Sequence, residues 1–339
     1  MSRCLLTGAS GFIGGHLAER LVHDGHDVRC LVRAGSDTSR LQALELHTVR
    51  GELTEPRSLA QAVEGCELVL HCAARVSDWG TRAEIARVNV TGTRSLLEAS
   101  ARASVKRFIH LSTTDVYGHP GAGPIAESYT ATRFANWYAQ TKLEAEHEVR
   151  RATTEQQLEA VILRPATVYG PGSFDVVAEI ARALRARQML LIDHGRALAG
   201  LCYVENLIDA VMLALHHETA PGEAFNVSDG LTVTWRQFTD DLAAGLGARP
   251  ARLSLPYPLA HALGFSLEHG YRLLRRGTGL STPALLSRQA VQVLGRDQDF
   301  STRNARETLG WEPRIDYAAG LAATLAWLEA EALKRPGAR

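Results

Sequence analysis

A glycine-rich segment near the start of the chain restricts its fold more than any other feature. Residues 7–14 have the sequence TGASGFIG and lie between a short apolar run, 3–7, and an amphipathic stretch, 12–24. Glycines at this spacing let the backbone turn tightly after a strand and approach a pyrophosphate, whose charge then lies at a helix N-terminus. Because a strand and a helix flank the glycines, we predict a dinucleotide-binding loop rather than a plain strand-to-helix turn. The residues predicted to contact the dinucleotide here are Gly8, Gly11, Phe12, Ile13 and Gly14.

Short apolar runs alternate with amphipathic stretches through the first half of the chain. This alternation is typical of βαβ units, and right-handed crossovers then make a doubly wound parallel sheet the simplest topology. We therefore predict an α/β fold built on a Rossmann sheet. The predicted strands are 3–7, 27–32, 47–50, 67–71, 106–111 and 159–163, and the predicted helices are 12–24, 56–64, 82–102 and 134–152.

The alternating pattern loosens after about residue 172. Helical stretches near 174–187, 206–217 and 234–246 are separated by prolines, and no repeat or low-complexity linker divides the chain. A length of 339 residues is compatible with about two domains. We expect residues 1–172 to form a dinucleotide-binding Rossmann domain, to which later segments near 200–227 return. Residues 173–335 are expected to form mainly a smaller C-terminal substrate-binding lobe.

Charge and composition exclude several classes of protein. The 37 Lys and Arg residues balance the 37 Asp and Glu residues, and 45% of the chain is hydrophobic. This apolar content without net charge argues against a disordered chain, and the lack of a basic excess argues against a nucleic-acid binder. No uncharged apolar stretch reaches the roughly 18 to 20 residues of a membrane span, and the first apolar run is too short for a signal peptide. We expect a cytoplasmic protein that acts on a small molecule, without a nucleic-acid partner or a membrane span.

The cysteines and histidines give no sign of a disulfide framework or a metal site. The five cysteines are an odd number, and most lie inside apolar runs, which predicts buried free thiols in a reducing compartment. The 13 histidines include no pair with clear metal-ligand spacing and a supporting acid. We therefore predict no metal.

An arginine after the second predicted strand favours NADP as the cofactor. Chains that bind NAD tend to carry an acid about 20 residues after the glycine loop, whereas an arginine there accommodates the 2′-phosphate of NADP. This chain has Arg33 and no acid before Asp37. NAD is left open, because a solvated arginine at a strand end is the alternative. A carboxylate after the third strand, which can reach the adenine amino group, and small residues after the fourth strand extend the site. These residues are Glu52, Leu53, Cys72, Ala73 and Ala74.

A tyrosine and a lysine stand four residues apart on a predicted helix. Tyr138 and Lys142 therefore project from one face of that helix. The ordinary pKa of tyrosine is near 10, and a neighbouring ammonium is expected to lower it by favouring the phenolate. Such a pair is matched to carbonyl reduction or alcohol oxidation, although it also arises by chance on protein surfaces. Hydroxyl residues 112–114 end the fifth predicted strand, where parallel sheets place their chemistry, and they favour the catalytic interpretation.

Five motifs, in this order along the chain, resemble the extended short-chain dehydrogenase/reductase superfamily. The motifs are residues 7–14, 89–93, 112–118, 138–142 and 163–172. The resemblance covers nearly the whole chain. It implies that Thr113 holds the substrate oxygen, that Tyr138 transfers the proton, and that Lys142 binds the nicotinamide ribose and tunes the tyrosine. The same resemblance adds Asn89, Pro165 and Val168 to the cofactor-binding residues, together with Tyr138 and Lys142.

Many members of the superfamily act on nucleotide sugars, and this chain lacks one of their features. Epimerases and dehydratases of this kind usually carry an arginine whose guanidinium binds the buried diphosphate. The matching stretch, 199–204, has Ala199 in that position, and Arg196 is a candidate replacement. A nucleotide-sugar 4-epimerase is therefore kept as the alternative function rather than the favoured one.

The C-terminal part is similar to the 3β-hydroxysteroid dehydrogenase-like branch of the superfamily. Residues 222–227, 255–257 and 300–313 carry this similarity, and loop 75–80 resembles a loop of bacterial 2-alkyl-3-oxoalkanoate reductases. The resemblance implies an NADP-dependent ketoreductase or alcohol dehydrogenase with a largely apolar, steroid-like or β-keto-acyl-like substrate. It also implies a homodimer formed through helices 82–102 and 134–152. A non-catalytic cofactor sensor is a second alternative, which the intact catalytic motif disfavours.

Overall fold

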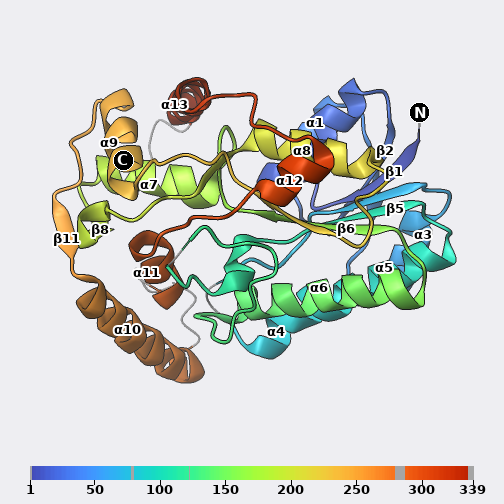
Figure 1. Cartoon of the computed structure of the whole chain (residues 1–339), viewed down its shortest axis with the longest axis horizontal. Helices are drawn as coiled ribbons and strands as arrows, with labels where there is room; N and C mark the ends of the chain where they lie inside the picture. The colour runs from blue at the N-terminus through green and yellow to red at the C-terminus, as the bar shows by residue number, and fades with distance from the viewer. Residues whose placement is uncertain (1, 78–79, 122, 279–286, 335–339) are drawn as a thin grey trace.

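A seven-stranded parallel sheet forms the centre of the N-terminal part (Figure 1). The structure is a computed structural model that describes residues 2–77, 80–121, 123–278 and 287–334. The strand order is β10-β6-β5-β4-β1-β2-β3, so the direction of winding reverses between β1 and β4. The strands are β1 (Arg3–Thr7), β2 (Asp27–Val32), β3 (His47–Arg50), β4 (Leu68–His71), β5 (Arg107–Leu111), β6 (Ala160–Pro165) and β10 (Ala224–Val227). The predicted α/β Rossmann fold is confirmed.

Helices cover both faces of the sheet, because successive side chains of its strands point to opposite faces. On β1, Cys4 and Leu6 pack into the layer that contains α1 and α8, whereas Leu5 packs into the layer that contains α3, α5 and α6. Each fully buried apolar side chain of this kind contributes about 1.5 to 3 kcal/mol to stability. The two layers lie above and below the sheet in Figure 1. These helices are α1 (Phe12–His23), α3 (Pro56–Val63), α5 (Thr93–Arg102), α6 (Trp137–Glu155) and α8 (Val204–His216).

Two predicted helices differ in detail from the structure. The helix predicted over 134–152 begins only at Trp137, because the Asn136 side chain caps it by accepting a hydrogen bond from Ala139 N at 2.9 Å. The helix predicted over 82–102 is present, but its middle, Arg87–Gly92, is π-helical between α4 (Arg82–Ala86) and α5. A short helix, α2 (Ser39–Ala43), was not predicted. The homodimer expected through these helices stays a prediction.

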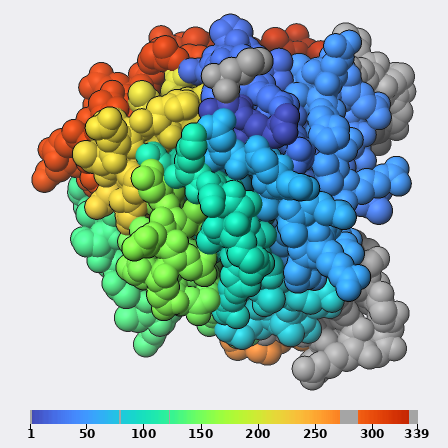
Figure 2. Space-filling model, turned by 90° about the vertical axis from the view of Figure 1, so that its right-hand side faces the viewer, coloured from blue at the N-terminus to red at the C-terminus, as the bar shows by residue number. Residues whose placement is uncertain are grey.

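The C-terminal part packs against the first half with its own core. Short strands pair outside the main sheet, β7 (Thr167–Tyr169) with β9 (Leu201–Tyr203) and β8 (Leu190–Ile192) with β11 (Leu253–Leu255). In Figure 2, early segments in blue to green and later segments in yellow and red lie against one another on one face. The remaining helices are α7 (Glu179–Arg185), α9 (Trp235–Gly245), α10 (Tyr257–Thr278), α11 (Arg288–Gly295), α12 (Arg303–Leu309) and α13 (Tyr317–Lys334).

Helix α10 lies at the edge of the molecule, where it packs against α11 (Figure 1). The sequence leaves open whether this amphipathic run covers an apolar pocket or is an ordinary packed helix. Several of its apolar side chains are exposed, namely Leu259, Leu263, Phe265 and Leu267, whereas Ala260 is buried. No helix within the described ranges combines the length and the apolar character needed to cross a membrane.

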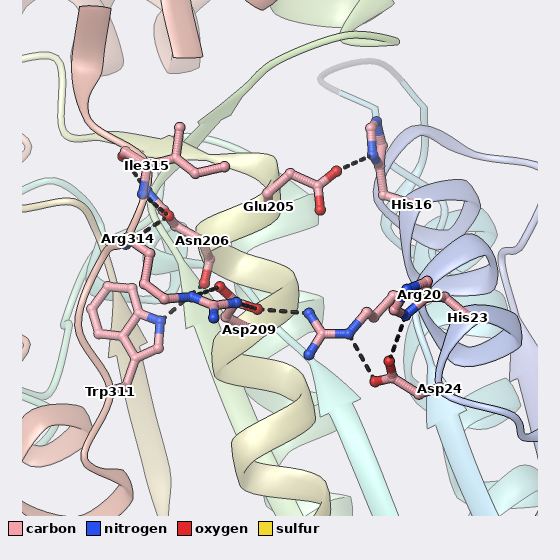
Figure 3. A network of polar contacts seen from close by, with 10 residues as sticks. All are labelled: His16, Arg20, His23, Asp24, Glu205, Asn206, Asp209, Trp311, Arg314 and Ile315. Carbon is pink, nitrogen blue, oxygen red and sulfur yellow. Dashed lines mark hydrogen bonds and ion pairs between the residues drawn. The ribbon is translucent and has the colours of Figure 1, made fainter. Parts of the chain in front are cut away.

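A buried asparagine on α8 holds the segment that precedes α13 (Figure 3). Asn206 Oδ1 accepts hydrogen bonds from the backbone N–H groups of Arg314 and Ile315, both at 3.0 Å. Its Nδ2 donates to Ile315 O at 2.9 Å and to Asp229 Oδ1 at 3.0 Å. The Asn206 carbonyl accepts from Trp311 Nε1 at 2.9 Å. Both the oxygen and the nitrogen of the Asn206 side chain thus make two hydrogen bonds each.

A carboxylate one turn later on α8 joins the same segment to α1 (Figure 3). Asp209 accepts from Arg314 Nε at 2.8 Å and Nη2 at 2.6 Å, and from Arg20 Nη1 at 2.7 Å. Nearby, His16 Nδ1 lies 2.8 Å from Glu205 Oε1. These contacts fix the C-terminal part against the first helix of the sheet domain.

Replacing Asn206 with leucine is expected to destabilise the chain strongly. Asn206→Leu keeps the side-chain size but removes the partners of two backbone N–H groups and one carbonyl in the partly buried segment 314–315, and one partner of the buried Asp229 carboxylate. Each of these groups that stays cut off from water costs about 1 to 3 kcal/mol. We expect a loss of about 3 kcal/mol or more in the free energy of unfolding, measured by denaturant titration. The control is Asn304→Leu at a half-buried site, which removes one hydrogen bond to Ala224 O and one from Thr308 Oγ1 and should cost about 1 kcal/mol. Equal stabilities of the two variants would contradict this account.

Candidate active site

A cleft of about 600 Å³ opens at the carboxyl ends of the central strands. It lies where the strand order reverses, which is where open α/β sheets bind their ligands. The ends of β1, β2 and β5 contribute Thr7, Val32 and Leu111 to its wall. The predicted cofactor residues in its lining are Gly8, Gly11, Phe12, Ile13, Gly14, Arg33, Glu52, Leu53, Cys72, Ala73 and Ala74.

Two glycines allow the close backbone approach that shapes this cleft. Gly8 has φ +76°, and a Cβ there would lie 2.7 Å from Ala73 N. A Cβ on Gly14 would overlap the carbonyl oxygen of Gly8. Gly11 begins α1 without a side-chain cap, and no acidic residue lies in the first turn. The first amides of α1 are therefore available to an anion such as a pyrophosphate, so the loop fits a dinucleotide.

Other cleft residues were not identified from the sequence. Arg75 and Arg87 come from the loop after β4 and the π-helical segment, and Asp175 comes from the C-terminal part. No local sequence pattern identifies these three residues as cleft residues, because they reach the cleft through packing between segments that are distant in the sequence. Asp78 and Trp79 of the loop that carried the family resemblance lie outside the described residues.

Asn89, Pro165 and Val168 lie outside the residues that line the cleft. The Asn89 side chain is buried and engaged with the protein: Oδ1 accepts from Arg75 N at 2.7 Å, and Nδ2 donates to Arg75 O and Thr141 Oγ1, both at 3.2 Å. Asn89 therefore fixes the loop after β4 against α6. Pro165 ends β6 and Val168 lies in β7. Direct cofactor contacts by these three residues stay predictions.

Helix α6 brings the tyrosine and lysine to the end of β5. Lys142 is 2% exposed, and its Nζ donates to the carbonyl of Leu111 at 2.8 Å and lies 3.1 Å from His110 Nε2. Tyr138 is half-buried one turn earlier on the same helix. Thr113, Tyr138 and Lys142 are not among the residues that line the cleft, and Lys142 is connected to its wall through the carbonyl of Leu111.

The third predicted catalytic residue, Thr113, begins the short turn after β5. Its Oγ1 accepts a hydrogen bond from Asp115 N at 3.2 Å. Because that bond uses only a lone pair, the hydroxyl proton stays available for donation. Thr113 is half-buried, like Tyr138.

The environment shifts the pKa values of Tyr138 and Lys142 in different ways. Burial lowers the pKa of Lys142 to about 8, although Glu146 opposes this shift. Burial, and then the charge of Asp115, raise the pKa of Tyr138. The expectation that Lys142 lowers the pKa of Tyr138 is therefore wrong in this structure. The physical reason is that the phenolate would be desolvated beside a carboxylate, while the ammonium is bonded to the end of β5.

A buried ion pair holds the turn that carries Thr113. Arg164 on β6 donates to Glu146 on α6 through Nε at 2.9 Å and Nη2 at 2.5 Å. Ser112 Oγ donates to the same carboxylate at 2.6 Å, and Arg164 Nη1 donates to Tyr117 OH at 2.8 Å. Both charges are nearly inaccessible, and each is hydrogen-bonded, which is the condition under which a buried ion pair is tolerated.

A neutral histidine lies behind the glycine loop. His71 is 1% exposed, with Nδ1 2.8 Å from Thr7 Oγ1 and Nε2 2.9 Å from Thr93 Oγ1. Thr93 donates its proton to Asn89 O at 2.6 Å, so it accepts from His71 Nε2–H. Thr7 accepts from Ala73 N and donates to His71 Nδ1. Burial, and then the charge of Lys142, lower the pKa of His71 to about 3.

Within the described residues, no group of three or more histidine, cysteine, aspartate or glutamate side chains is placed to hold a metal ion. The cysteines are unpaired, and four of them, Cys4, Cys30, Cys66 and Cys202, are buried. Burial also raises the pKa of the half-buried Cys72 thiol in the cleft to about 12, which disfavours its reactive thiolate.

Comparison with known proteins gives consistent matches. Residues 4–228 match the model of the NAD dependent epimerase/dehydratase family. A 4-hydroxy-2-methyl-3-oxo-4-farnesyl-3,4-dihydroquinoline-1-oxide ketoreductase of Stigmatella aurantiaca is 32% identical over 324 residues, 94% of each chain. A 2-alkyl-3-oxoalkanoate reductase of Stenotrophomonas maltophilia is 29% identical, covering 94% of this chain and 97% of the relative. A 3-beta-hydroxysteroid dehydrogenase of Mycolicibacterium neoaurum is 29% identical, covering 96% and 91%.

Solved structures share the fold over nearly the whole chain. The structure of MoeE5 in complex with UDP-glucuronic acid and NAD superposes with a TM-score of 0.76 at 26% identity, and covers 98% of this chain and 100% of that chain.

Acidification is expected to destabilise the fold through His71. Its pKa is about 3 in the folded chain and near 6.5 when unfolded, so the unfolded state binds the extra proton between these values. The stability that the neutral imidazole contributes is complete above pH 6.5 and is lost as the pH falls towards 3. The free energy of unfolding should decrease by about 2 kcal/mol between pH 7.5 and 5.0 through this residue alone.

Denaturant titrations of wild type and His71→Gln at both pH values measure this contribution. The variant should show a pH dependence weaker by that amount, whereas the control His23→Gln, at an exposed histidine, should match wild type. An unchanged pH dependence in His71→Gln would show that His71 does not titrate as inferred.

Proposed function

Because the chain belongs to the NAD-dependent epimerase/dehydratase family, we propose that it is an oxidoreductase that transfers hydride between a nicotinamide cofactor and a ketone or secondary alcohol. One observation carries this proposal. Lys142 bonds the carbonyl of Leu111, a residue of the cleft wall, and Tyr138 lies one turn away on α6. A tyrosine and a lysine of the type that transfers protons, joined to the cleft wall through Leu111, support this proposal.

In such a reaction, different residues of the site would bind the cofactor, orient the substrate and transfer the proton. The nicotinamide cofactor, when bound, supplies or accepts the hydride. The free amides at the start of α1 bind the pyrophosphate, and Glu52 with Leu53 contacts the adenine. Tyr138 donates its phenolic proton to the substrate oxygen during reduction, and Thr113 donates a hydrogen bond to the same oxygen. Lys142, which is buried and whose pKa burial lowers to about 8, binds the nicotinamide ribose.

NADP is the proposed cofactor because of Arg33. This exposed arginine lines the cleft beyond the end of β2, beside Ser36, whose N–H donates to Arg33 O at 3.2 Å. A guanidinium there would bind a 2′-phosphate through charge-assisted hydrogen bonds. NAD remains the alternative, since the solved structure of MoeE5 contains NAD.

An uncharged, largely apolar substrate fits the chain better than a nucleotide sugar. Ala199, in place of the arginine expected to bind a diphosphate, is fully buried, and Arg196 is exposed. The names of the three relatives describe a farnesylated quinoline oxide, an alkyl-oxoalkanoate and a steroid. We propose that residues 173–335 mainly form the part that covers this substrate. The epimerase alternative would be favoured instead if a UDP- or TDP-sugar raised the melting temperature of the protein.

Removing the phenolic hydroxyl of Tyr138 is expected to abolish most of the activity. Tyr138→Phe keeps the ring but cannot transfer a proton, so kcat should fall by about 10² to 10⁴-fold while the affinity for NADPH is retained. The assay follows NADPH absorbance with a panel of apolar ketones and secondary alcohols, and fluorescence titration measures the binding of NADPH. Tyr129→Phe, at an exposed tyrosine, is the matched control. Undiminished turnover in Tyr138→Phe would remove this residue from the mechanism.

Replacing Arg33 is expected to reduce the preference for NADP. Arg33→Ala should weaken NADPH binding about 10-fold or more, because a charge-assisted hydrogen bond is lost, and should leave NADH binding unchanged. The dissociation constants of both cofactors measure the effect, with Arg57→Ala, at an exposed arginine on α3, as the control. The cofactor proposal fails if wild type binds NADPH no better than NADH and the variant shows the same ratio.

A further inference from the structure

A buried histidine follows the turn that carries Thr113. His119 comes directly after the turn Thr114–Tyr117 and Gly118, and its side chain is 1% exposed. Its backbone has φ +51°, a left-handed conformation that costs a residue other than glycine about 1 kcal/mol. Contacts of the imidazole must offset that cost.

The hydrogen bonds around His119 determine its protonation. Gln298 Nε2 donates to Arg296 O at 2.8 Å, which directs Gln298 Oε1 towards His119 Nδ1, 2.8 Å away. An amide oxygen only accepts, so Nδ1 carries a proton. On the other side of the ring, Nε2 lies 3.1 Å from Asp115 Oδ1. An ionised carboxylate also only accepts, so this contact favours a proton on Nε2 as well, which makes His119 an imidazolium when both contacts are hydrogen bonds.

A second glutamine from the C-terminal part completes this cluster. The side-chain nitrogen of Gln289, on α11, lies 2.9 Å from His119 Nε2, and its buried Oε1 has no partner. Rotating that amide half a turn places the oxygen beside the imidazolium, as an acceptor. Helix α11 lies next to the connection that follows β5 in Figure 1. With the Gln289 amide in that orientation, residues far apart in the sequence present oxygen atoms to both ring nitrogens of His119.

Asp115 connects this cluster to the proposed catalytic residues. Its backbone N–H donates to Thr113 Oγ1 at 3.2 Å, and its carboxylate is 21% exposed, much more than the imidazole. The Asp115 carboxylate therefore contacts His119 and is also partly accessible to solvent. The turn Thr114–Tyr117, which contains Asp115, packs against α6, which carries Tyr138. The charge of Asp115 also contributes, after burial, to the raised pKa of Tyr138.

We propose that His119 is a positioning residue that holds the Asp115 carboxylate beside the catalytic turn, so that the two opposite charges together govern proton transfer at Tyr138. This inference rests on the proposed function, which assigns the proton transfer to Tyr138. The pair does not touch the substrate in this account. It acts through the electrostatic field at the tyrosine, and the glutamines of the C-terminal part keep it in place.

Other charged groups lie near His119 and Tyr138 and contribute to the pH dependence. Lys142 and Glu146 share α6 with Tyr138, and His110 on β5 lies against Lys142. Near His119, Asp297 and Asp299 flank Gln298 in the sequence, and Asp297 accepts from Leu198 N at 2.9 Å. Arg296 packs near Gly121 and Asp299 packs near Gly123 of the loop that follows His119. Burial lowers the pKa of His119, but the hydrogen bond and charge of Asp115, with Gln298, more than reverse this, so the pKa is raised overall.

The first measurement is the protonation state of His119 in the full-length protein. Nitrogen-15 chemical shifts of the imidazole, assigned by comparison with His119→Gln, should show two protonated nitrogens at pH 7.5. In Asp115→Asn the imidazolium loses its counter-charge while it remains buried, so the same resonances should be those of a neutral ring at that pH. A neutral His119 in the wild type at pH 7.5 would overturn the proposal.

The second measurement is the pH profile of NADP-dependent oxidation of a secondary alcohol found in the substrate screen. Asp115→Asn removes a negative charge near Tyr138 and should shift the rising limb to lower pH by about half to one pH unit. His119→Gln keeps a hydrogen bond to Asp115 but removes the positive charge, so its limb should shift to higher pH. A merely structural role predicts weaker activity without these opposite shifts.

Asp299→Asn is the matched control, because it removes a carboxylate adjacent to Gln298 without touching the pair; its profile should match wild type. Unshifted limbs, or shifts in the same direction, in the two test variants would overturn the inference while leaving the proposed function intact. If Tyr138→Phe disproves the proposed function, the influence of the His119–Asp115 pair on Tyr138 can still be measured. Ultraviolet difference spectra against Tyr138→Phe then report the ionisation of the Tyr138 phenol. Earlier ionisation in Asp115→Asn supports the influence of the pair, and identical ionisation overturns it.

Discussion

The close backbone approach at Gly8 and Gly14 is the constraint on which the rest of this structure depends. A side chain at Gly8 would meet the chain after β4, and one at Gly14 would meet the Gly8 carbonyl, so neither position has room for a Cβ. This approach brings the start of α1 to the point where the winding of the sheet reverses, and it leaves the first amides of α1 facing the cleft. Behind the same loop, Thr7 and His71 form a buried polar contact that links β1 to β4. One steric requirement thus determines both the binding surface and the polar layer beneath it.

The sequence predicts the sheet well because its strands are buried on both faces and alternate with amphipathic helices. The resemblance to the dehydrogenase/reductase superfamily is also confirmed, since the family match spans residues 4–228. Strand β10 of the main sheet was not predicted as a strand, although residues near 200–227 were expected to return to the Rossmann domain. Strands β7, β8, β9 and β11 were missed as well, and three or four residues are too few to show a period. The start of α6 was misplaced because the cap at Asn136 depends on one side-chain hydrogen bond rather than on periodicity. Arg87 and Asp175 reach the cleft only through packing between distant segments, which no local pattern records.

The pKa shifts of Tyr138 and Lys142 follow from their surroundings rather than from their spacing in the motif. A tyrosine and a lysine at this spacing suggest an ammonium that favours the phenolate, yet the surroundings decide otherwise. Burial disfavours both charged forms, and Lys142 donates to the end of β5 rather than to the tyrosine. The Glu146–Arg164 pair holds the turn after β5 in place, so the charges near Tyr138 are fixed by buried contacts rather than by solvent. The protonation of such a site is therefore a property of the packed fold and not of the motif.

The two parts of the chain meet at two separate places, and this has consequences for how the site is formed. At one of them, Asp209 on α8 binds Arg20 on α1 and also Arg314 of the segment before α13, which Asn206 holds as well. At the other, His119 is held by Gln289 on α11 and by Gln298, which follows α11. Breaking either junction exposes buried polar groups whose partners lie in the other part, at about 1 to 3 kcal/mol for each group left unpaired. The C-terminal part is thus not independent of the first half, because the hydrogen bonds between them also hold His119 and Asp115 beside the turn that carries Thr113.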